Sequence, residues 1–236
     1  MSQAETPNNS WRSLYIIGGI APLVTLTFYV SEFIFIPRDG YPATIEGWFS
    51  LIHSSKYAGL LYLNALDIIS ISLLGVMFMA IYIALRQANK SLTAVATYFA
   101  LLGVTVFVVP RVAALSLLPL SDRYAAATTD AQRAAILGAG EALGALVGPT
   151  PLTAGFLLMA VGVFILSIVM LRAGLFNKAT AYLGLAASVL TMVDHVTVIS
   201  APALAIPLMI VSGLFWIPWW VVVGLGLLRL ARLEEM

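Results

Sequence analysis

The chain has 236 residues, of which 61% are hydrophobic and only 10% are charged, and its net charge is +1. A soluble domain is typically about 45–50% apolar and about 25% charged, so this composition excludes an ordinary soluble enzyme, a disordered chain and a nucleic-acid-binding protein. The sequence has no cysteine, which excludes disulfides and thiolate chemistry. The class that remains is a polytopic α-helical membrane protein.

Six apolar segments are each long enough to cross a bilayer, which takes about 20 residues. In chain order they are predicted at 14–36, 57–85, 92–118, 152–171, 179–200 and 203–230. The polar residues before the first segment do not resemble a secretory signal peptide, so we expect that segment to be an uncleaved first span. The sequence therefore predicts an all-α fold with one six-span membrane domain over residues 14–230. Short polar cytoplasmic tails are expected at 1–13 and 231–236.

Six spans place both termini on the same side of the membrane. The basic residues of that side are Arg12, Arg86, Lys90, Arg172, Lys178, Arg229 and Arg232, and those of the other side are Arg38, Lys56, Arg123 and Arg133. Lysine and arginine near the ends of spans favour the cytoplasmic side. We therefore expect the N-in/C-in orientation.

Two segments between the spans are too long to be simple turns. Residues 37–56 contain Trp48, Phe49, Leu51 and Ile52, which favours a short interfacial helix. In residues 119–150, Thr129 and Gln132 have the spacing of a capping box. An alanine-rich helix is predicted to follow at 130–147, either outside the membrane or at its interface.

Three glycines recur at a spacing of four residues at the end of that predicted helix: Gly140, Gly144 and Gly148. Small residues at this spacing let two helices approach closely. The pattern predicts close packing there and a homo-oligomer held through this face, although small residues also recur simply because the helix is rich in alanine.

Short motifs in the second, fourth and fifth spans resemble those of one known family. The second span opens with Tyr57-Ala-Gly-Leu-Leu-Tyr-Leu, and the fourth ends in Leu171-Arg-Ala-Gly-Leu-Phe-Asn-Lys. The fifth continues Ala181-Tyr-Leu-Gly-Leu-Ala and carries Asp194 near its outer end. Over roughly residues 12–230 the chain resembles the bacterial membrane family catalogued as domain of unknown function 4386. The resemblance implies a six-helix inner-membrane protein without an assigned activity, and it aligns Arg111 with the arginine usual in the family's third helix.

Polar side chains within the spans are the candidates for a functional site. An ionisable group at the centre of a bilayer costs about 2.5–3.5 kcal/mol on insertion scales, so it needs a partner or water. The candidate cluster comprises Asn64, Asp67, Arg111, Glu141, Asp194 and His195. Counting along the helices places Asp67 near the midplane and Arg111 and Asp194 in the outer half. Asn64 and Asp67 are three residues apart and are expected to share one helix face.

This cluster has two interpretations. In the first it lines a polar pocket open to the outside, with Arg111 as an anion anchor and the carboxylates as its partners. In the second, Arg111 pairs with Asp67 or Asp194 and only fastens the bundle. His195, next to Asp194, is either a proton relay or a hydrogen-bonded interhelical residue. For Glu141 the alternative to ligand binding is a solvated position or a role in packing.

We therefore predict a protein that binds or transports a small molecule or lipid, an interpretation that also relies on helices broken at Pro110 and Pro218. A structural or accessory subunit is the first alternative, and a membrane enzyme using Asp194 and His195 is the second. The expected partners are the lipid bilayer and a small-molecule or lipid ligand, not nucleic acid. Motifs such as HExxH do not occur, so no metal or other cofactor is expected.

Overall fold

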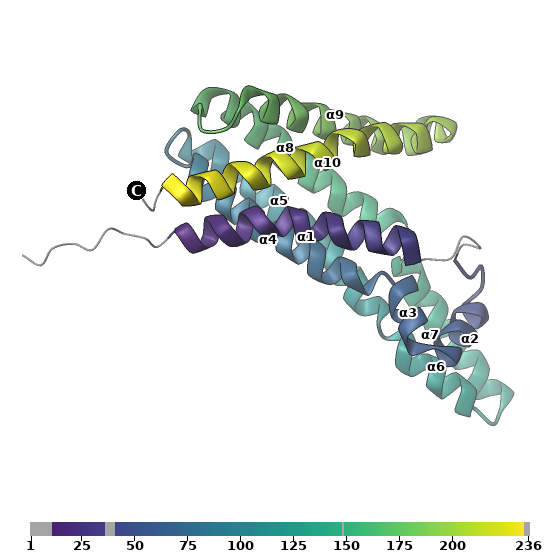
Figure 1. The fold of residues 1–236 in the computed structure, drawn as a ribbon. Coiled ribbons are helices and arrows are strands. Elements are labelled where there is room, and N and C mark those ends of the chain that lie inside the picture. The colour runs from purple at the N-terminus through teal and green to yellow at the C-terminus, as the bar shows by residue number, and fades with distance from the viewer. Residues whose placement is uncertain (1–10, 36–40, 148, 234–236) are drawn as a thin grey trace, which may run out of the picture.

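The computed structural model describes residues 11–35, 41–147 and 149–233, and these form helices and no strands (Figure 1). The helices are α1 (Arg12–Phe35), α2 (Ile45–Ser54), α3 (Lys56–Tyr62), α4 (Ala65–Leu85), α5 (Lys90–Ala114), α6 (Leu117–Ala126), α7 (Asp130–Val147), α8 (Pro149–Ala173), α9 (Lys178–Ser200) and α10 (Pro202–Leu233). Most of the two predicted tails, residues 1–10 and 234–236, lies outside the described residues, as does Gly148.

Six helical segments are long and apolar enough to cross a membrane, which confirms the predicted fold class. They are Arg12–Ser31, Ala65–Leu85, Lys90–Ala126, Thr153–Ala173, Lys178–Thr197 and Pro207–Leu233. The third has 37 residues, because α6 continues from α5 after a short interruption. At 1.5 Å per residue it is about 55 Å long, well beyond the about 30 Å of a hydrocarbon core. A segment of this length would extend beyond a hydrocarbon core at one end.

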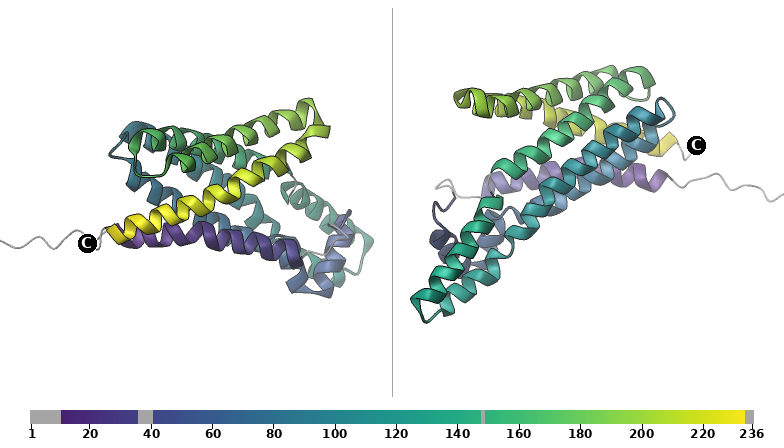
Figure 2. Two further views of the ribbon diagram at one scale, coloured as in Figure 1. Left: turned by 45° about the horizontal axis from the view of Figure 1, so that its top comes forward. Right: turned by 180° about the vertical axis from the view of Figure 1, so that it is seen from behind.

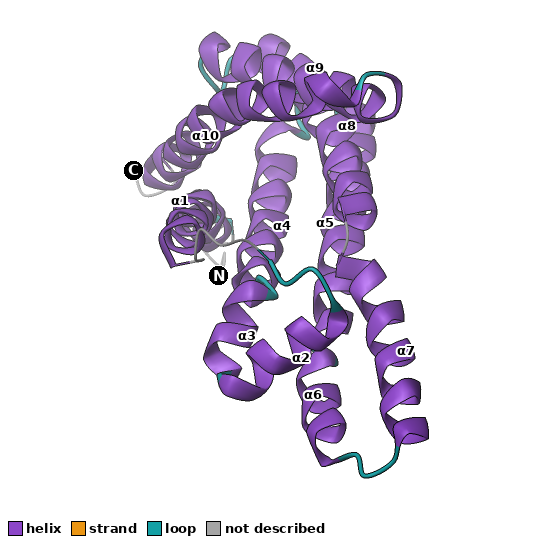
Figure 3. Cartoon of the chain, turned by 90° about the vertical axis from the view of Figure 1, so that its right-hand side faces the viewer, coloured by secondary structure: helices purple, strands orange, loops and turns teal. Residues whose placement is uncertain are grey.

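The long helices form a ring in the order α1, α4, α5, α8, α9 and α10, with α10 packed against α1 (Figures 2 and 3). We call the end where α1 begins and α10 ends the inner end, and the opposite end the outer end. Large buried side chains fill the ring, among them Phe78 of α4 and Trp219 of α10. Both ends of the described chain lie together at the inner end (Figure 1).

The short helices form a separate layer at the outer end. Helices α2, α3, α6 and α7 pack beyond the start of α4 and the end of α5, as Figure 1 shows. They enclose a second hydrophobic core, made of Ile45, Phe49, Ile52, Leu63, Ala114 and Leu117. We call these four helices the outer layer.

Both helices predicted between the spans are present. Helix α7 has the predicted bounds, and the Gln132 N–H donates to Thr129 Oγ1 over 3.3 Å. The Gln132 side chain accepts from the N–H of Thr128 over 3.2 Å rather than from that of Thr129, so two threonines share the cap. Helix α2 begins after Thr44, whose hydroxyl accepts from the N–H of Gly47 over 3.2 Å.

The second span is shorter than predicted. The prediction began at Tyr57, but residues 56–62 form the separate helix α3, and the span begins at Ala65. Asn64 lies between the two helices with φ 51° and ψ 48°, a left-handed conformation that asparagine adopts more readily than most residues. It interrupts the helix, so the prediction that Asn64 and Asp67 share a helix face is wrong. Asp67 lies in the first turn of α4 and not near the midplane of a longer span.

The helix breaks predicted at two prolines are also wrong. Helix α5 passes through Pro110, and α10 passes through both Pro207 and Pro218. Neighbouring helices and small local adjustments can satisfy the backbone groups that a proline frees within a bundle. The real interruption between α5 and α6 falls at Leu115 and Ser116. Because α5 and α10 are continuous at these prolines, broken helices no longer support a transport function.

Candidate functional site

A buried ion pair links α4 to α5 at the outer end of the ring. Arg111 Nη2 lies 3.0 Å from Asp67 Oδ2, and the two residues are only 6% and 4% exposed. Asp67 is in the first turn of α4 and Arg111 is in the last turn of α5. An anion near a helix N-terminus and a cation near a helix C-terminus both interact favourably with the helix dipoles, so each charge suits its position.

The pair lies where the two hydrophobic cores meet. Leu63, just before α4, belongs to the outer core, and the chain then passes through Asp67 to Ile71 of the ring core. Along α5 it passes from Phe107 of the ring core, through Arg111, to Ala114 of the outer core. The pair is therefore a polar boundary between two apolar regions.

The ion pair leaves two polar atoms unsatisfied. Asp67 Oδ1 and Arg111 Nε are buried, and neither has a hydrogen-bond partner among the described residues. A guanidinium has five N–H donors and a carboxylate has about four acceptor positions, so a contact between one nitrogen and one oxygen uses little of this capacity. Buried polar atoms without partners are rare in native proteins and often indicate an unseen water, ion or ligand.

Aromatic packing holds the guanidinium of Arg111 in place. Its Cζ lies 5.4 Å from the centre of the Phe107 ring, and Phe107 in turn packs edge-on against Phe156 of α8. An aromatic face attracts a cation without using its N–H donors. The guanidinium is thus oriented while some of its donors stay available.

Asn64 supports the start of α4 rather than joining the charged pair through its side chain. Its carbonyl accepts from the N–H of Asp67 over 3.0 Å. Its side-chain amide lies 3.4 Å from the hydroxyl of Tyr41, which packs with Trp48 and Tyr62 of the outer layer. Asn64 is therefore a positioning residue for Asp67.

His195 and Asp194 lie on α9, and His195 links that helix to α8. His195 Nδ1 is 2.6 Å from the carbonyl oxygen of Thr191, and Nε2 is 2.5 Å from that of Thr153 on α8. A neutral imidazole donates through one nitrogen only, whereas an imidazolium donates through both. Asp194 Oδ1 is buried without a partner among the described residues. The carboxylate that meets Arg111 is that of Asp67.

Glu141 does not belong to the buried cluster. It lies on α7 in the outer layer and its side chain is exposed. The position agrees with the solvated alternative. The structure therefore joins Asp67 and Arg111 directly, and Asn64 through the backbone.

The comparison with protein families now identifies what the chain is. The family described as a domain of unknown function (DUF4386) matches residues 14–228. The chain belongs to this family. No curated protein and no solved structure matches it. Membership of DUF4386 agrees with the resemblance of the short motifs, and the family has no assigned function.

Sequence reasoning missed several contacts that join neighbouring helices of this DUF4386 protein. Thr25 of α1 donates to the carbonyl of Ser70 on α4 over 2.9 Å, and Trp216 of α10 donates to the hydroxyl of Thr191 on α9 over 2.8 Å. Tyr29 of α1 stacks on Trp220 of α10 with ring centres 5.8 Å apart. The only signal for them in the sequence is a hydroxyl or indole on an otherwise apolar helix, which does not name its partner.

The glycines of α7 pack within the chain. A methyl group on Gly140 would lie 2.7 Å from both Ile45 Cγ1 and Phe49 Cζ of α2. A methyl group on Gly144 would lie 3.7 Å from Ile45 Cδ1. The predicted close approach therefore occurs against α2, whereas the homo-oligomer through this face stays a prediction.

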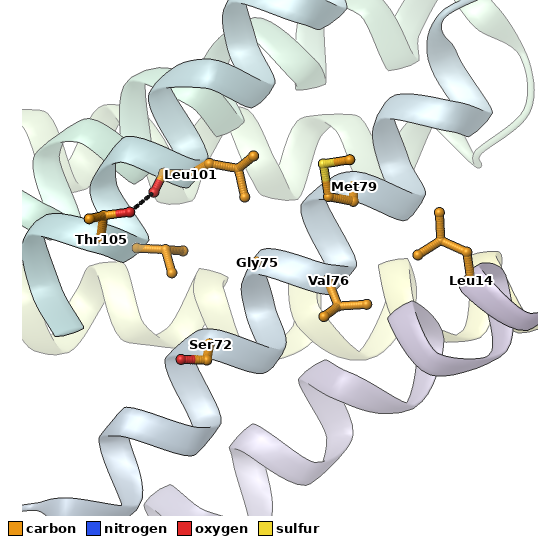
Figure 4. A pocket seen from close by; sticks show the side chains of 8 residues that line it. Leu14, Ser72, Gly75, Val76, Met79, Leu101 and Thr105 are labelled. Atoms are coloured by element: carbon orange, nitrogen blue, oxygen red, sulfur yellow. Dashed lines mark hydrogen bonds between the residues drawn. The ribbon is translucent and has the colours of Figure 1, made fainter.

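A shallow groove of about 560 Å³ lies between α1, α4 and α5 (Figure 4). Its walls are mostly apolar, and its two hydroxyls already bond within their own helices: Ser72 to the carbonyl of Ile68, and Thr105 to that of Leu101 over 3.0 Å. The groove therefore offers little to a polar ligand. In the described part of the chain, no three His, Asp or Glu side chains lie close enough to hold a metal ion.

Proposed function

We propose that this protein is a bacterial inner-membrane protein that binds a small anionic molecule, or the anionic headgroup of a lipid, in the outer half of its helix ring. Arg111 is the anion anchor, and Asp67 is its counter-ion when the site is empty. The observation that carries the proposal is the incomplete ion pair, in which Arg111 Nε and Asp67 Oδ1 are buried without partners among the described residues.

The chemistry of the pair suits an anion. A guanidinium binds a carboxylate or phosphate through two parallel N–H donors, and the contact with Asp67 Oδ2 uses only Nη2. A cation removed from bulk water interacts more strongly with an anion than one at the surface. An arriving anion would take over the donors of Arg111, and Phe107 would keep the guanidinium in its plane.

Native mass spectrometry of protein released from mild detergent tests the proposal. The wild-type protein should carry a discrete, stoichiometric ligand that Arg111→Ala loses. Arg111→Lys should retain it weakly, because lysine keeps the positive charge but lacks the paired N–H donors of a guanidinium. Arg123→Ala is the matched control, since Arg123 lies in the last turn of α6, outside the ring. A wild-type protein without any ligand, or one in which every bound ligand is kept equally by Arg111→Ala, would contradict the proposal.

A structural role is the second candidate, and a specific observation favours it. The Asp67–Arg111 pair, the His195–Thr153 contact, the Thr25–Ser70 bond and the Trp216–Thr191 bond each join two neighbouring helices of the ring. In this interpretation the Asp67–Arg111 pair is one of several contacts that hold neighbouring helices of the ring together. The enzyme alternative gains no comparable support, because both ring nitrogens of His195 already face carbonyl oxygens.

The proposal includes the N-in/C-in orientation, supported by the basic residues of the inner end. Because the sequence has no cysteine, single cysteines can be labelled cleanly. In intact cells a membrane-impermeant maleimide should label Thr128→Cys, at the tip between α6 and α7, but not Arg232→Cys, at the end of α10. The reverse pattern of labelling would overturn this orientation.

A further inference from the structure

A second cavity lies at the inner end, far along the bundle from the ion pair. It has a volume of about 440 Å³ and lies between the start of α1, the end of α4 and the end of α10. Tyr15, Ile83 and Leu230 form its apolar wall, and Trp11, Arg86 and Gln87 form its polar side. Leu175, from the loop between α8 and α9, and Leu233 lie at its exposed rim, 47% and 51% exposed.

Arg86 is held in this cavity by an aromatic ring and not by an acid. Its Cζ lies 5.3 Å from the centre of the Trp11 ring. Among residues 11–35, 41–147 and 149–233 it forms no ion pair. A guanidinium stacked on an indole keeps its N–H edge free to donate. The cavity therefore combines an apolar wall with an oriented, unneutralised cation.

Basic side chains gather among the described residues around the cavity. The described residues of this end, 11–20, 80–95, 166–182 and 222–233, contain no Asp or Glu. Apart from Arg12, which already has an interaction partner, their basic residues are Arg86, Lys90, Arg172, Lys178, Arg229 and Arg232. Such a field attracts anions, and the potential adds to that of Arg86 itself.

We propose that this cavity binds an anionic phospholipid from the surrounding bilayer. The phosphate accepts from Arg86 and Gln87 at the rim, and the first part of an acyl chain lies along Tyr15, Ile83 and Leu230. A soluble anion would use the charge but gain nothing from the apolar wall, whereas a lipid uses both. The proposed orientation would place the cavity in the cytoplasmic leaflet, which contains anionic lipids and has a negative surface potential.

This site is independent of the one at Arg111, because it lies at the opposite end of the ring and shares no residue with it. The two proposals can therefore fail separately. Arg111→Ala should leave binding at the inner cavity unchanged, and Arg86→Gln should leave any ligand of the outer site in place.

The test is a titration of the full-length protein in mild detergent with dioleoyl phosphatidylglycerol or dioleoyl phosphatidylcholine, read by native mass spectrometry. These lipids share their acyl chains and differ in headgroup charge. We expect the protein to retain phosphatidylglycerol more strongly, and Arg86→Gln to weaken that retention about fivefold, as expected for one basic residue near a membrane surface. Arg123→Gln, at the opposite end, should match the wild-type protein.

A second variant keeps the test decisive if Arg86→Gln does not fold. Gln87→Glu replaces an exposed amide with an isosteric carboxylate beside Arg86, so it should lower phosphatidylglycerol retention without altering packing. Equal retention of the two lipids by the wild-type protein, or unchanged retention in Gln87→Glu, would overturn the proposal. Displacement of the lipid by millimolar inorganic phosphate would also overturn it, because the site would then be one for a soluble anion.

Discussion

The helix ring and the outer layer are held together in different ways. In the ring, α5 and α8 touch through glycines: a methyl group on Gly103 would lie 2.6 Å from the carbonyl oxygen of Gly155. Gly162 of α8 is equally close to the carbonyl of Ala96 on α5. In the outer layer, large side chains such as Phe49 and Ile52 fill a small core between amphipathic helices.

The difference follows from the solvent that each region meets. Lipid tails are as apolar as leucine, so helices in a membrane gain little from burying apolar faces and depend on close backbone approach and interhelical hydrogen bonds. Where helices meet water, burying a side chain such as Phe49 removes apolar surface from water and stabilises the packing directly. The Asp67–Arg111 pair lies at the boundary between the helix ring and the outer layer.

The largest effect is expected from removing the centre of the outer core. Phe49 is 1% exposed, and truncating a buried phenylalanine to alanine costs about 3–5 kcal/mol. Phe49→Ala should therefore loosen the outer layer while leaving the ring intact. Hydrogen exchange should show lost protection in α2, α6 and α7 and normal protection in α9 and α10. Tyr57→Ala, at an 87% exposed position, is the control. Equal loss of protection in the ring would show that the two cores are not separable.

An extra side chain between α5 and α8 should give the next largest effect. Gly103→Val places branched carbons against the backbone of Gly155 and Met159, and overpacking costs about 1–3 kcal/mol. Its melting temperature in detergent should fall well below that of the wild-type protein. Gly213→Ala, where nothing lies within 4 Å of an added methyl group, should melt at or slightly above the wild-type temperature. A wild-type melting curve for Gly103→Val would refute close packing as the basis of the ring.

The smallest effect is expected from one interhelical hydrogen bond. Thr25 donates to Ser70 on α4 as well as to Ala21 on its own helix, whereas Thr27 donates only to Leu23 within α1. Single hydrogen bonds between membrane helices contribute about 0.6 kcal/mol on average. Thr25→Val should therefore lower the unfolding free energy by about that amount, and Thr27→Val should not. Identical unfolding curves for the two variants would show that the Thr25–Ser70 hydrogen bond does not stabilise the protein.

The amino-acid sequence was sufficient to predict the parts of the fold that depend on local composition. Hydropathy located six spans, and an alanine-rich run with a threonine cap located α7 at its observed bounds. The start of α4 could not be found in this way, because residues 57–63 are themselves mostly apolar and no charged residue separates them from the span that follows. The break there depends on the backbone of Asn64 and on its contact with Tyr41, which lies 23 positions earlier in the chain.

The candidate site was only partly predictable for a similar reason. The cost of a charge in a membrane singled out Asp67, Arg111 and Asp194 as groups that need partners. Choosing Asp67 over Asp194 required the order of helices in the ring, in which α5 neighbours α4 and α8 but not α9. Periodicity within one helix carries no information about that order.

The charge reversal Asp67→Arg with Arg111→Asp tests the central claim most directly. It keeps an ion pair between α4 and α5 but moves the cation off α5 and away from Phe107. Compared with the single variant Arg111→Asp, which leaves two carboxylates facing each other, the double variant should regain most of the melting temperature. If Arg111 is the anion anchor, the double variant should still lack the ligand that Arg111→Ala loses in native mass spectrometry. A reversed pair that retains the wild-type ligand would contradict the account and assign the pair to fastening the bundle alone.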